Sequence, residues 1–282
     1  MPAPIPTLEL AGIGPVPILG QGTWRMGERG ADRDAEAEAL RHGIDLGLTL
    51  IDTAEMYGNG GAERVVADAI AGRRDTVQLV SKVLPYNASR RGTIAACEQS
   101  LARLGTDRLD LYLLHWRGSH PLAETVAGLE ELRRDGRIRA WGVSNFDVDD
   151  MEDVLAVPGG AHCAVNQVLY NLGARGIEYD LFGWSAVHRI PIMAYSPLGN
   201  DGRLLRHPEL VRIAAARDAT PAQVALAFVL ARDNVVAIPK AARRAHLADN
   251  RAALDHTLDA ADHAALDRAF PPPRRKQPLA ML

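Results

Sequence analysis

Short apolar stretches and longer amphipathic stretches alternate along this chain. A short apolar run predicts a buried strand, and apolar residues spaced three and four apart predict a helix. The pattern predicts strands at residues 19–24, 49–54, 76–84, 109–115, 138–143, 164–167, 191–195 and 235–239. It predicts helices at residues 34–46, 61–71, 93–104, 122–134, 148–155, 179–188, 207–217, 221–231, 244–254 and 260–270. The helix at 221–231 has a clear start, because Thr220 is a good N-cap and Pro221 suits the first helical position.

Strict alternation of strands and helices indicates an α/β fold with a parallel sheet, because each helix returns the chain to the start of the next strand. Eight such units in roughly 250 residues match the size of a (β/α)8 TIM barrel. A doubly wound open sheet is the alternative. No linker interrupts the series, so the sequence predicts a single domain over residues 1–282.

Two proline-rich segments lie outside the repeating units. Residues 2–17 precede the first strand, and we expect a β-hairpin there that closes the floor of the barrel. Residues 271–282 (PPPRRKQPLAML) contain too many prolines for a helix, so they predict an extended tail.

Composition narrows the class of protein. Hydrophobic residues make up 47% and charged residues 24%, as in a globular protein rather than a disordered one. The net charge of −3 argues against a nucleic-acid partner, since such proteins carry a basic excess. No apolar run reaches the roughly 20 residues of a membrane span, and the N-terminus lacks the pattern of a secretory signal. The two cysteines, Cys97 and Cys163, are too few for a disulfide framework and fit the cytoplasm.

Polar or aromatic residues follow almost every predicted strand. In a (β/α)8 barrel, the carboxyl ends of the strands line the active site. The residues at these ends are Gly22, Thr23, Trp24, Asp52, Tyr57, Lys82, His115, Trp116, Ser144, Asn145, Asn166, Gln167, Tyr195, Ser196, Pro197, Leu198, Pro239 and Lys240. We therefore expect these residues to surround one pocket.

Four residues, Asp52, Tyr57, Lys82 and His115, form a set suited to proton transfer. Tyrosine is a poor acid at neutral pH, with an unperturbed pKa of about 10. The ammonium of Lys82 can lower the pKa of Tyr57, and Asp52 can be the partner that a buried lysine needs. His115 can hydrogen-bond a carbonyl oxygen and orient it. The set suits proton donation to an oxygen that becomes an alkoxide.

Each of these residues alone has a plainer interpretation. Asp52 and Lys82 could form a structural ion pair, Tyr57 could pack on a loop, and His115 could be a hydrogen-bonded histidine at a strand end. A metal site needs several His, Asp or Glu side chains at the strand ends. Only Asp52 and His115 qualify, so we expect no metal. The four residues together favour a functional site.

Several blocks of the sequence resemble the aldo-keto reductases. They are GTW (22–24), IDTAEMYGNGGAE (51–63), VSK (80–82), LDLYLLHW (109–116), GVSNF (142–146), NQVLYN (166–171), AYSPLG (194–199) and IPKAARRAHLADN (238–250). The blocks cover nearly the whole chain in the family's order. The resemblance implies that Tyr57 is the general acid and Lys82 modulates its pKa. It implies that Asp52 is the partner of the lysine and that His115 orients the carbonyl group.

The resemblance also implies a nicotinamide cofactor, although no GxGxxG motif follows the first strand. Ser144, Asn145 and Gln167 are then expected to bind its carboxamide, and the ring of Tyr195 to stack on the nicotinamide. The implied phosphate contacts are Ser196, Pro197, Leu198, Pro239 and Lys240, and the implied adenine contacts are Asp249 and Asn250. The other implied cofactor contacts are Gly22, Thr23, Asp52, Ile238, Ala241, Arg243 and His246.

Two positions depart from the family's pattern. The family often has Ser directly after the lysine of the last strand and Arg six residues after that lysine, and both help hold the 2′-phosphate. This chain has Ala241 and His246 there. Lys240 remains, Arg243 and Arg244 are close by, and lysine and arginine side chains can bind a phosphate. We therefore expect NADPH as the cofactor, with NADH as the alternative.

The expected substrate is a small carbonyl compound. Trp24 and Trp116 follow the first and fourth strands and could form apolar walls of the pocket. Arg117 follows Trp116 and is a candidate to bind a carboxylate or a polar dicarbonyl, and a solvated arginine is the alternative. Because the tail is short and basic, we expect an open pocket and a broad substrate range.

The resemblance is to small bacterial members that reduce dicarbonyls such as methylglyoxal and other small aldehydes. We therefore expect a monomeric reductase that uses NADPH. The alternative is a non-catalytic relative that binds nucleotide as a regulatory or redox-sensing subunit.

Overall fold

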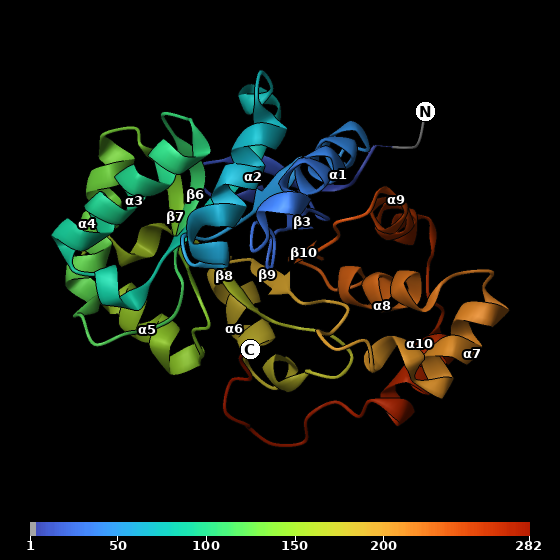
Figure 1. Ribbon diagram of the computed structural model, residues 1–282. Helices are drawn as coiled ribbons and strands as arrows, with labels where there is room; N and C mark the ends of the chain where they lie inside the picture. The colour runs from blue at the N-terminus through green and yellow to red at the C-terminus, as the bar shows by residue number, and fades with distance from the viewer. Residues whose placement is uncertain (1–3) are drawn as a thin grey trace.

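Eight parallel strands form a barrel at the centre of the molecule (Figure 1). This computed structural model describes residues 4–282. The strands of the barrel are β3 (Gln21–Gly22), β4 (Leu50–Asp52), β5 (Gln78–Val83), β6 (Leu109–Leu114), β7 (Ile138–Ser144), β8 (Cys163–Leu169), β9 (Ile192–Tyr195) and β10 (Val235–Ile238). They lie side by side in sequence order, and parallel bridges from Leu19 to Ala237 and from Gly22 to Lys240 join the two ends of the sheet. The expected (β/α)8 barrel is confirmed.

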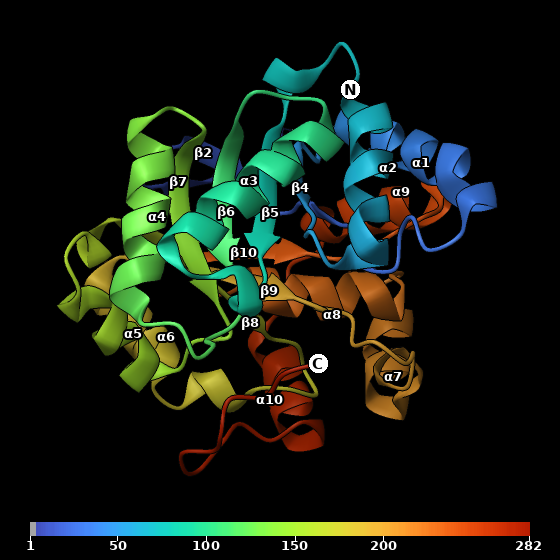
Figure 2. The same ribbon diagram turned by 60° about the vertical axis from the view of Figure 1, so that its left-hand side comes forward.

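Helices surround the barrel, and in Figure 2 α3 and α4 lie over β5, β6 and β7. The α-helices are α1 (Arg33–Asp45), α2 (Gly61–Ile70), α3 (Arg90–Leu104), α4 (Leu122–Arg134), α5 (Val148–Ala156), α6 (Leu181–His188), α7 (Pro208–Ala216), α8 (Pro221–Leu230), α9 (Arg244–Ala252) and α10 (Ala260–Ala269). The short 3₁₀ turns are Gly30–Asp32, Tyr57–Gly60, Arg74–Thr76, Pro85–Asn87, Gly160–His162, Gly176–Glu178, Leu204–Arg206 and Ala253–Asp255. The predicted start of α8 is confirmed, because Thr220 and Gln223 form a reciprocal capping box with Pro221 in the first turn.

The first strand of the barrel is shorter than predicted. Residues 19–24 are expected to form a strand, but β3 covers Gln21–Gly22. The N–H of Thr23 still bonds to the Asp52 carbonyl oxygen at 3.0 Å. Arg25 then has a φ of 64°, in the left-handed region where a strand cannot continue. This turn takes the chain from the barrel wall to the rim of the pocket.

A two-stranded hairpin closes the amino-terminal end of the barrel. Strands β1 (Thr7–Leu10) and β2 (Gly14–Pro17) pair in antiparallel fashion. Side chains of the hairpin, Leu10, Ile13 and Val16, form one buried cluster with inward-facing residues of the barrel. The hairpin expected at the floor is confirmed, while residues 1–3 of the proline-rich start lie outside the described part of the chain.

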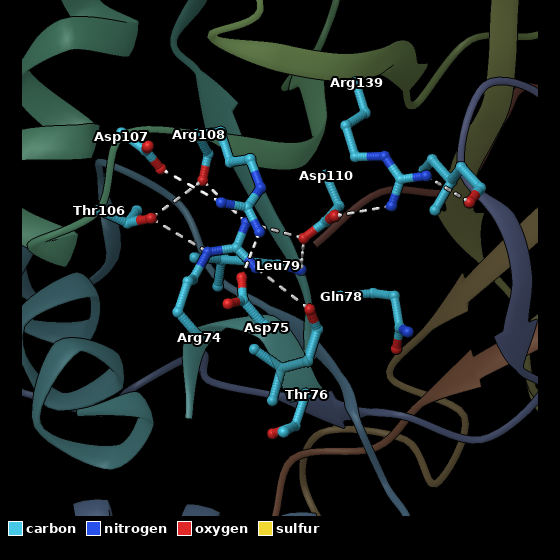
Figure 3. Close-up of polar contacts among 12 residues, drawn as sticks. Arg74, Asp75, Thr76, Gln78, Leu79, Thr106, Asp107, Arg108, Asp110 and Arg139 are labelled. Atoms are coloured by element: carbon cyan, nitrogen blue, oxygen red, sulfur yellow. Dashed lines mark hydrogen bonds and ion pairs between the residues drawn. The ribbon is translucent and has the colours of Figure 1, made fainter. Parts of the chain in front are cut away.

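A polar network around Asp110 lies at the same end of the barrel (Figure 3). The side chain of Asp110 is 5% exposed, and its Oδ2 accepts hydrogen bonds from Arg74 Nη2 and from the Leu79 N–H, both at 2.9 Å. Arg139 reaches the other carboxylate oxygen at 3.4 Å and donates to the Ile13 carbonyl oxygen at 2.8 Å. The network therefore ties the three strands β5, β6 and β7 to the hairpin, far from the carboxyl ends of the strands.

The C-terminal tail is extended, as predicted. Residues 271–282 contain neither a helix nor a strand, and Figure 1 shows them leaving α10 and turning back across the molecule. Among the described residues, no single helix is long and apolar enough to cross a membrane. Helices α7 and α8 taken together would be long and apolar enough by length and composition alone, but they meet at an angle of 91°.

Candidate active site

A pocket of about 410 Å³ opens at the carboxyl ends of the strands. Its lining contains most residues that the sequence places at the strand ends: Gly22, Thr23, Trp24, Asp52, Tyr57, His115, Trp116, Ser144, Asn145, Gln167, Tyr195, Ser196, Pro197, Leu198, Pro239 and Lys240. Ile238, the last residue of β10, also lines it. Parallel strands bring their carboxyl ends to the same end of a barrel, which explains why residues so distant in sequence meet.

Lys82 lies at the floor of this pocket. It faces the barrel interior from β5, and its side chain is 0% exposed. Its Nζ donates to Asp52 Oδ2 at 2.7 Å, to the Thr53 carbonyl oxygen at 2.9 Å and to Tyr57 Oη at 3.2 Å. Burial by itself lowers the pKa of Lys82, but Asp52 and Tyr57 outweigh burial, so the pKa is raised. Lys82 is therefore a buried ammonium whose three donors are all used.

Asp52 connects this lysine to the opposite wall of the barrel. Its Oδ2 accepts from Lys82, and its Oδ1 accepts from Gln167 Nε2 at 2.7 Å. Gln167 Nε2 also lies 3.0 Å from Met193 Sδ. The carboxylate therefore fixes the lysine and the glutamine amide together.

Tyr57 is held at the centre of the pocket with its proton in place. Burial raises the pKa of Tyr57 above its usual value of about 10, and the neighbouring Lys82 ammonium offsets only part of that rise. The net lowering expected from the sequence is therefore wrong, because the depth of burial outweighs the charge. Since Lys82 donates to the phenol oxygen, the phenol proton remains free to be donated elsewhere.

His115 lies beside Tyr57, with ring centroids 5.7 Å apart. Burial, and then the Lys82 ammonium, lower the pKa of His115 to about 2. The imidazole is therefore neutral at physiological pH. Its Nδ1 is buried without a hydrogen-bond partner among the described residues. Such a ring can exchange a hydrogen bond with a ligand without carrying a charge.

A set of polar groups continues along the pocket from His115 to Tyr195. Asn145 Nδ2 donates to the His115 carbonyl oxygen and to Ser144 Oγ, each at 3.1 Å. The Tyr195 hydroxyl donates to Asn145 Oδ1 at 2.8 Å. Asn145 has a φ of 60°, a left-handed conformation that aims its amide across the strand ends. These hydrogen bonds hold the amides and hydroxyls in place relative to one another.

Two tryptophans form apolar walls, as the sequence predicts. Trp116 contacts the His115 ring at a centroid distance of 5.0 Å and the Tyr86 ring at 6.3 Å. The guanidinium of Arg25 lies 4.5 Å from the centre of the Trp24 ring, and both residues line the pocket.

Arg117 does not enter the pocket. Its Nη1 lies 2.7 Å from carboxylate oxygens of both Asp150 and Asp153 on α5. The expectation that Arg117 contacts a substrate is corrected, because two acidic side chains hold the guanidinium outside the lining.

Five residues expected to contact a cofactor lie beyond the pocket lining, around the start of α9. Ala241 and Asn250 are buried, and Arg243 and His246 are exposed. Asp249 accepts hydrogen bonds from Thr220 at 3.1 Å and Gln223 at 2.8 Å, so its carboxylate is already engaged at the start of α8.

The C-terminal tail supplies lining residues that the sequence did not reveal. Met281 and Leu282 line the pocket, as do Gly199 and Asn200. A backbone hydrogen bond from Leu282 reaches Tyr195 and partly offsets the burial that raises the pKa of Tyr195 to about 12. The short tail therefore forms part of the pocket wall, and the broad substrate range expected from the sequence stays a prediction.

Lys276 explains why this short tail reaches the pocket. Its Nζ lies 2.5 Å from Asp147 Oδ1 and 2.8 Å from Asp180 Oδ2. These ion pairs hold the tail against the starts of α5 and α6. The basic residue was visible in the sequence, but its two acidic partners are distant in the chain.

Comparison with known proteins identifies the family. The model of the Aldo/keto reductase family matches residues 18–270. The chain is 53% identical over 279 residues to the methylglyoxal reductase YeaE of Escherichia coli, covering 98% of each chain. It is 33% identical to the methylglyoxal reductase DkgB of Salmonella typhi, over 89% of this chain and 92% of that one.

Solved structures give the same result. A crystal structure of an aldo/keto reductase from Klebsiella pneumoniae, in complex with NADP and acetate, has a TM-score of 0.96 and 52% identity, covering 99% of this chain and 100% of that chain. The thermostable aldo-keto reductase Tm1743, solved with the inhibitor epalrestat, has a TM-score of 0.85 and 38% identity, covering 93% and 99%. The chain therefore belongs to the aldo/keto reductase family and is an oxidoreductase.

Proposed function

We propose that this protein reduces small aldehydes and dicarbonyls, methylglyoxal among them, to alcohols with NADPH. One observation carries the proposal: Lys82 Nζ bridges Asp52 and Tyr57 at 2.7 and 3.2 Å on the floor of the pocket. A phenol that keeps its proton beside an ammonium can protonate a developing alkoxide. We propose that the chain acts as one domain, as a cytoplasmic monomer.

The residues of the pocket fit a nicotinamide cofactor. The hydroxyl and amides of Ser144, Asn145 and Gln167 can bind a carboxamide, and the ring of Tyr195 beside them can lie against a flat heterocycle. Ser196, Pro197 and Leu198 continue the lining toward Lys240. When bound, the nicotinamide supplies the hydride for the carbonyl carbon.

The cationic end of this lining favours NADPH over NADH. Lys240 is exposed at the end of the pocket, and Arg243 is exposed at the start of α9. Neither side chain has a hydrogen bond or ion pair within the described residues 4–282, and cations of this kind suit the additional phosphate of NADPH. Arg244 is already paired with Glu38, so we assign the 2′-phosphate to Lys240 and Arg243. Ile238, Pro239, Ala241, His246, Asp249 and Asn250 complete the proposed cofactor region, with Gly22 and Thr23 on the neighbouring strand end, where the Gly22 N–H bonds to the Pro239 carbonyl oxygen.

The chain's own residues supply the proton that the substrate oxygen takes up. The neutral ring of His115 hydrogen-bonds the substrate oxygen and orients it toward Tyr57. Tyr57 then donates its phenol proton to that oxygen, and the Lys82 ammonium stabilises the phenolate that remains. Asp52 keeps Lys82 charged although the lysine side chain is fully buried. Trp24 and Trp116 enclose the apolar part of the substrate, which limits its size.

Turnover tests this proposal against simple nucleotide binding. We expect the protein to oxidise NADPH in the presence of methylglyoxal and to prefer NADPH to NADH. The loss of NADPH absorbance measures this reaction. Binding of NADPH should be measured in parallel by fluorescence. Binding without turnover over a panel of aldehydes would contradict the reductase assignment and support a regulatory nucleotide-binding protein.

A further inference from the structure

The turn that carries Tyr57 has an unusual backbone. Tyr57 opens the 3₁₀ turn Tyr57–Gly60, and Gly58, Asn59 and Gly60 have φ angles of 55°, 51° and 79°. Residues in this left-handed region are uncommon outside glycine, and they persist where the surrounding structure holds them. The position of the Tyr57 hydroxyl therefore depends on what packs against the turn.

The backbone around Gly27 supports the turn on one side. A Cβ atom at Gly61 would lie 2.3 Å from the Gly27 carbonyl oxygen, and one at Gly58 would lie 2.9 Å from the Met26 carbonyl oxygen. The Gly27 N–H donates to Glu36 Oε2 at 2.8 Å, which fixes this segment to α1. The turn has no room to move toward Gly27.

Arg103 of α3 packs against the same turn at Gly60. A Cβ atom at Gly60 would lie 2.6 Å from Arg103 Cδ, so the arginine stem lies directly against the turn. Arg103 Nε donates to Glu63 Oε2, and its Nη2 donates to Ser100 Oγ at 3.2 Å. The Arg103 side chain is 19% exposed. A shift of Arg103 would release the turn.

Glu63 joins this support to the strand that carries Lys82. The Glu63 side chain is 0% exposed. One carboxylate oxygen binds Arg103, and the other accepts a 2.6 Å hydrogen bond from Ser81 Oγ. Ser81 directly precedes Lys82, and successive strand residues point to opposite faces. Glu63 therefore holds β5 from outside the barrel while Lys82 reaches the pocket floor inside it.

We propose that Glu63 and Arg103 are positioning residues for proton transfer, whose ion pair sets the separation between Lys82 Nζ and Tyr57 Oη. The inference rests on the proposed roles of Tyr57 and Lys82. Neither Glu63 nor Arg103 lines the pocket. They act through the two segments that they connect, the turn after β4 and the strand β5.

Arg103 is the charge that compensates Glu63. Cys97 and Tyr112 also face Glu63. Burial raises the pKa of the Cys97 thiol to about 12 and the pKa of the Tyr112 phenol well above its usual value. Both groups are therefore neutral at physiological pH.

The Asp110 network provides a matched control (Figure 3). Asp110 and Arg74 are 5% and 15% exposed, close to the burial of Glu63 and Arg103. Asp110 also combines an arginine with a bond to β5, through the Leu79 N–H. This pair lies at the opposite end of the strand from the pocket, so its loss should affect stability alone.

The experiment compares Glu63→Gln with Asp110→Asn in the full chain. We expect both variants to lower the melting temperature. Glu63→Gln should lower kcat for methylglyoxal on the order of tenfold, since small misplacements of reacting groups are costly. Asp110→Asn should leave kcat within about twofold, because no group of the pocket moves. The dissociation constant of NADPH should change in neither variant.

The pH profile of the reverse reaction provides a second readout. Alcohol oxidation requires the Tyr57 phenolate, so its rate rises with pH through the pKa of Tyr57. Lys82 and Asp52 are charged groups that face Tyr57. His115 and Tyr195 also face it, and both are neutral, since burial lowers the pKa of His115 to about 2 and raises the pKa of Tyr195 to about 12. If Glu63→Gln lets Lys82 move away, the pKa of Tyr57 rises and the profile shifts to higher pH. Asp110→Asn should leave the profile in place.

Three outcomes are decisive. Equal losses of melting temperature with unchanged kcat and pH profile in both variants would overturn the proposal and leave Glu63 a structural residue. If Glu63→Gln does not fold, Ser81→Ala removes a single hydroxyl and must still lower kcat and shift the profile, or the proposal fails. If Tyr57→Phe keeps wild-type activity, the proposed function itself is contradicted, whatever the Glu63 variant shows.

Discussion

The ammonium of Lys82 lies 3.2 Å from the hydroxyl oxygen of Tyr57; the lysine side chain is fully buried, and the tyrosine is half-buried where it lines the pocket. An ammonium at this distance favours the phenolate, while burial favours the phenol. Burial is the larger effect, so Tyr57 keeps its proton. The lysine becomes important when that proton leaves, because it stabilises the charge that then appears.

Replacement of Lys82 by Met should impair both activity and stability. The change leaves Asp52 buried without its cation, and an unpaired buried charge costs about 3–5 kcal/mol. We expect a lower free energy of unfolding in urea and a large loss of kcat. The double variant Lys82→Met with Asp52→Asn should regain much of the stability but none of the activity. Recovery of activity in the double variant would show that Lys82 acts only structurally.

His115 should make the protein less stable in mild acid. Its pKa is about 2 in the folded protein and about 6.5 in the unfolded chain. Below pH 6.5 the unfolded state binds the extra proton, so stability falls as pH falls. At pH 5 this linkage amounts to about 2 kcal/mol.

A His115→Gln variant removes this proton linkage. The difference in unfolding free energy between pH 7 and pH 5 should then be smaller than in the wild type, as measured by urea unfolding at both values. His188→Gln, at an exposed position, is the control. An unchanged acid sensitivity in His115→Gln would mean that the ring is protonated in the folded protein.

Arg117→Ala should leave catalysis unchanged. Arg117 is held by Asp150 and Asp153 and does not line the pocket. We expect the KM values for methylglyoxal and for a carboxylate-bearing aldehyde to stay within about twofold of wild type, as for most substitutions outside a site. Trp116→Ala should raise both KM values, because it removes a wall of the pocket. A selective rise in KM for the charged aldehyde in Arg117→Ala would show that the arginine reaches the substrate.

Lys276→Met should release the tail from the pocket. The Lys276 side chain is 42% exposed, so its ion pairs with Asp147 and Asp180 are screened by salt. We expect NADPH to dissociate a few times faster in the variant, in line with a modest surface interaction. Stopped-flow fluorescence measures this rate, and high salt should have the same effect on the wild type. If neither the variant nor salt changes the rate, the tail does not control access.

The repeating pattern of the sequence predicted most of the fold. Helix α4 has the bounds 122–134 expected from its apolar spacing. Because parallel strands place their carboxyl ends together, the meeting of Asp52, Lys82 and His115 could also be predicted. The bounds of β3 could not, since the backbone of Arg25 turns there for reasons of local packing.

Other features of the site depend on how deeply side chains are buried and on contacts between residues that are distant in the sequence. The sequence indicates that Lys82 and Tyr57 are near each other, but the sign of the net pKa shift depends on how deeply both are buried. The path of the tail depends on Lys276 meeting Asp147 and Asp180, and the role proposed for Glu63 depends on Arg103. None of these pairs has a regular spacing that could reveal it.

The most direct measurement is kcat for methylglyoxal in Tyr57→Phe, with NADPH binding measured on the same preparation. The variant removes one hydroxyl and should keep both the fold and the cofactor affinity. The account predicts that kcat falls about 10²- to 10⁴-fold, the usual contribution of a positioned acid. Tyr179→Phe, at an exposed position, should behave as wild type. A Tyr57→Phe variant that binds NADPH and retains wild-type kcat would contradict the central claim that Tyr57 donates the proton.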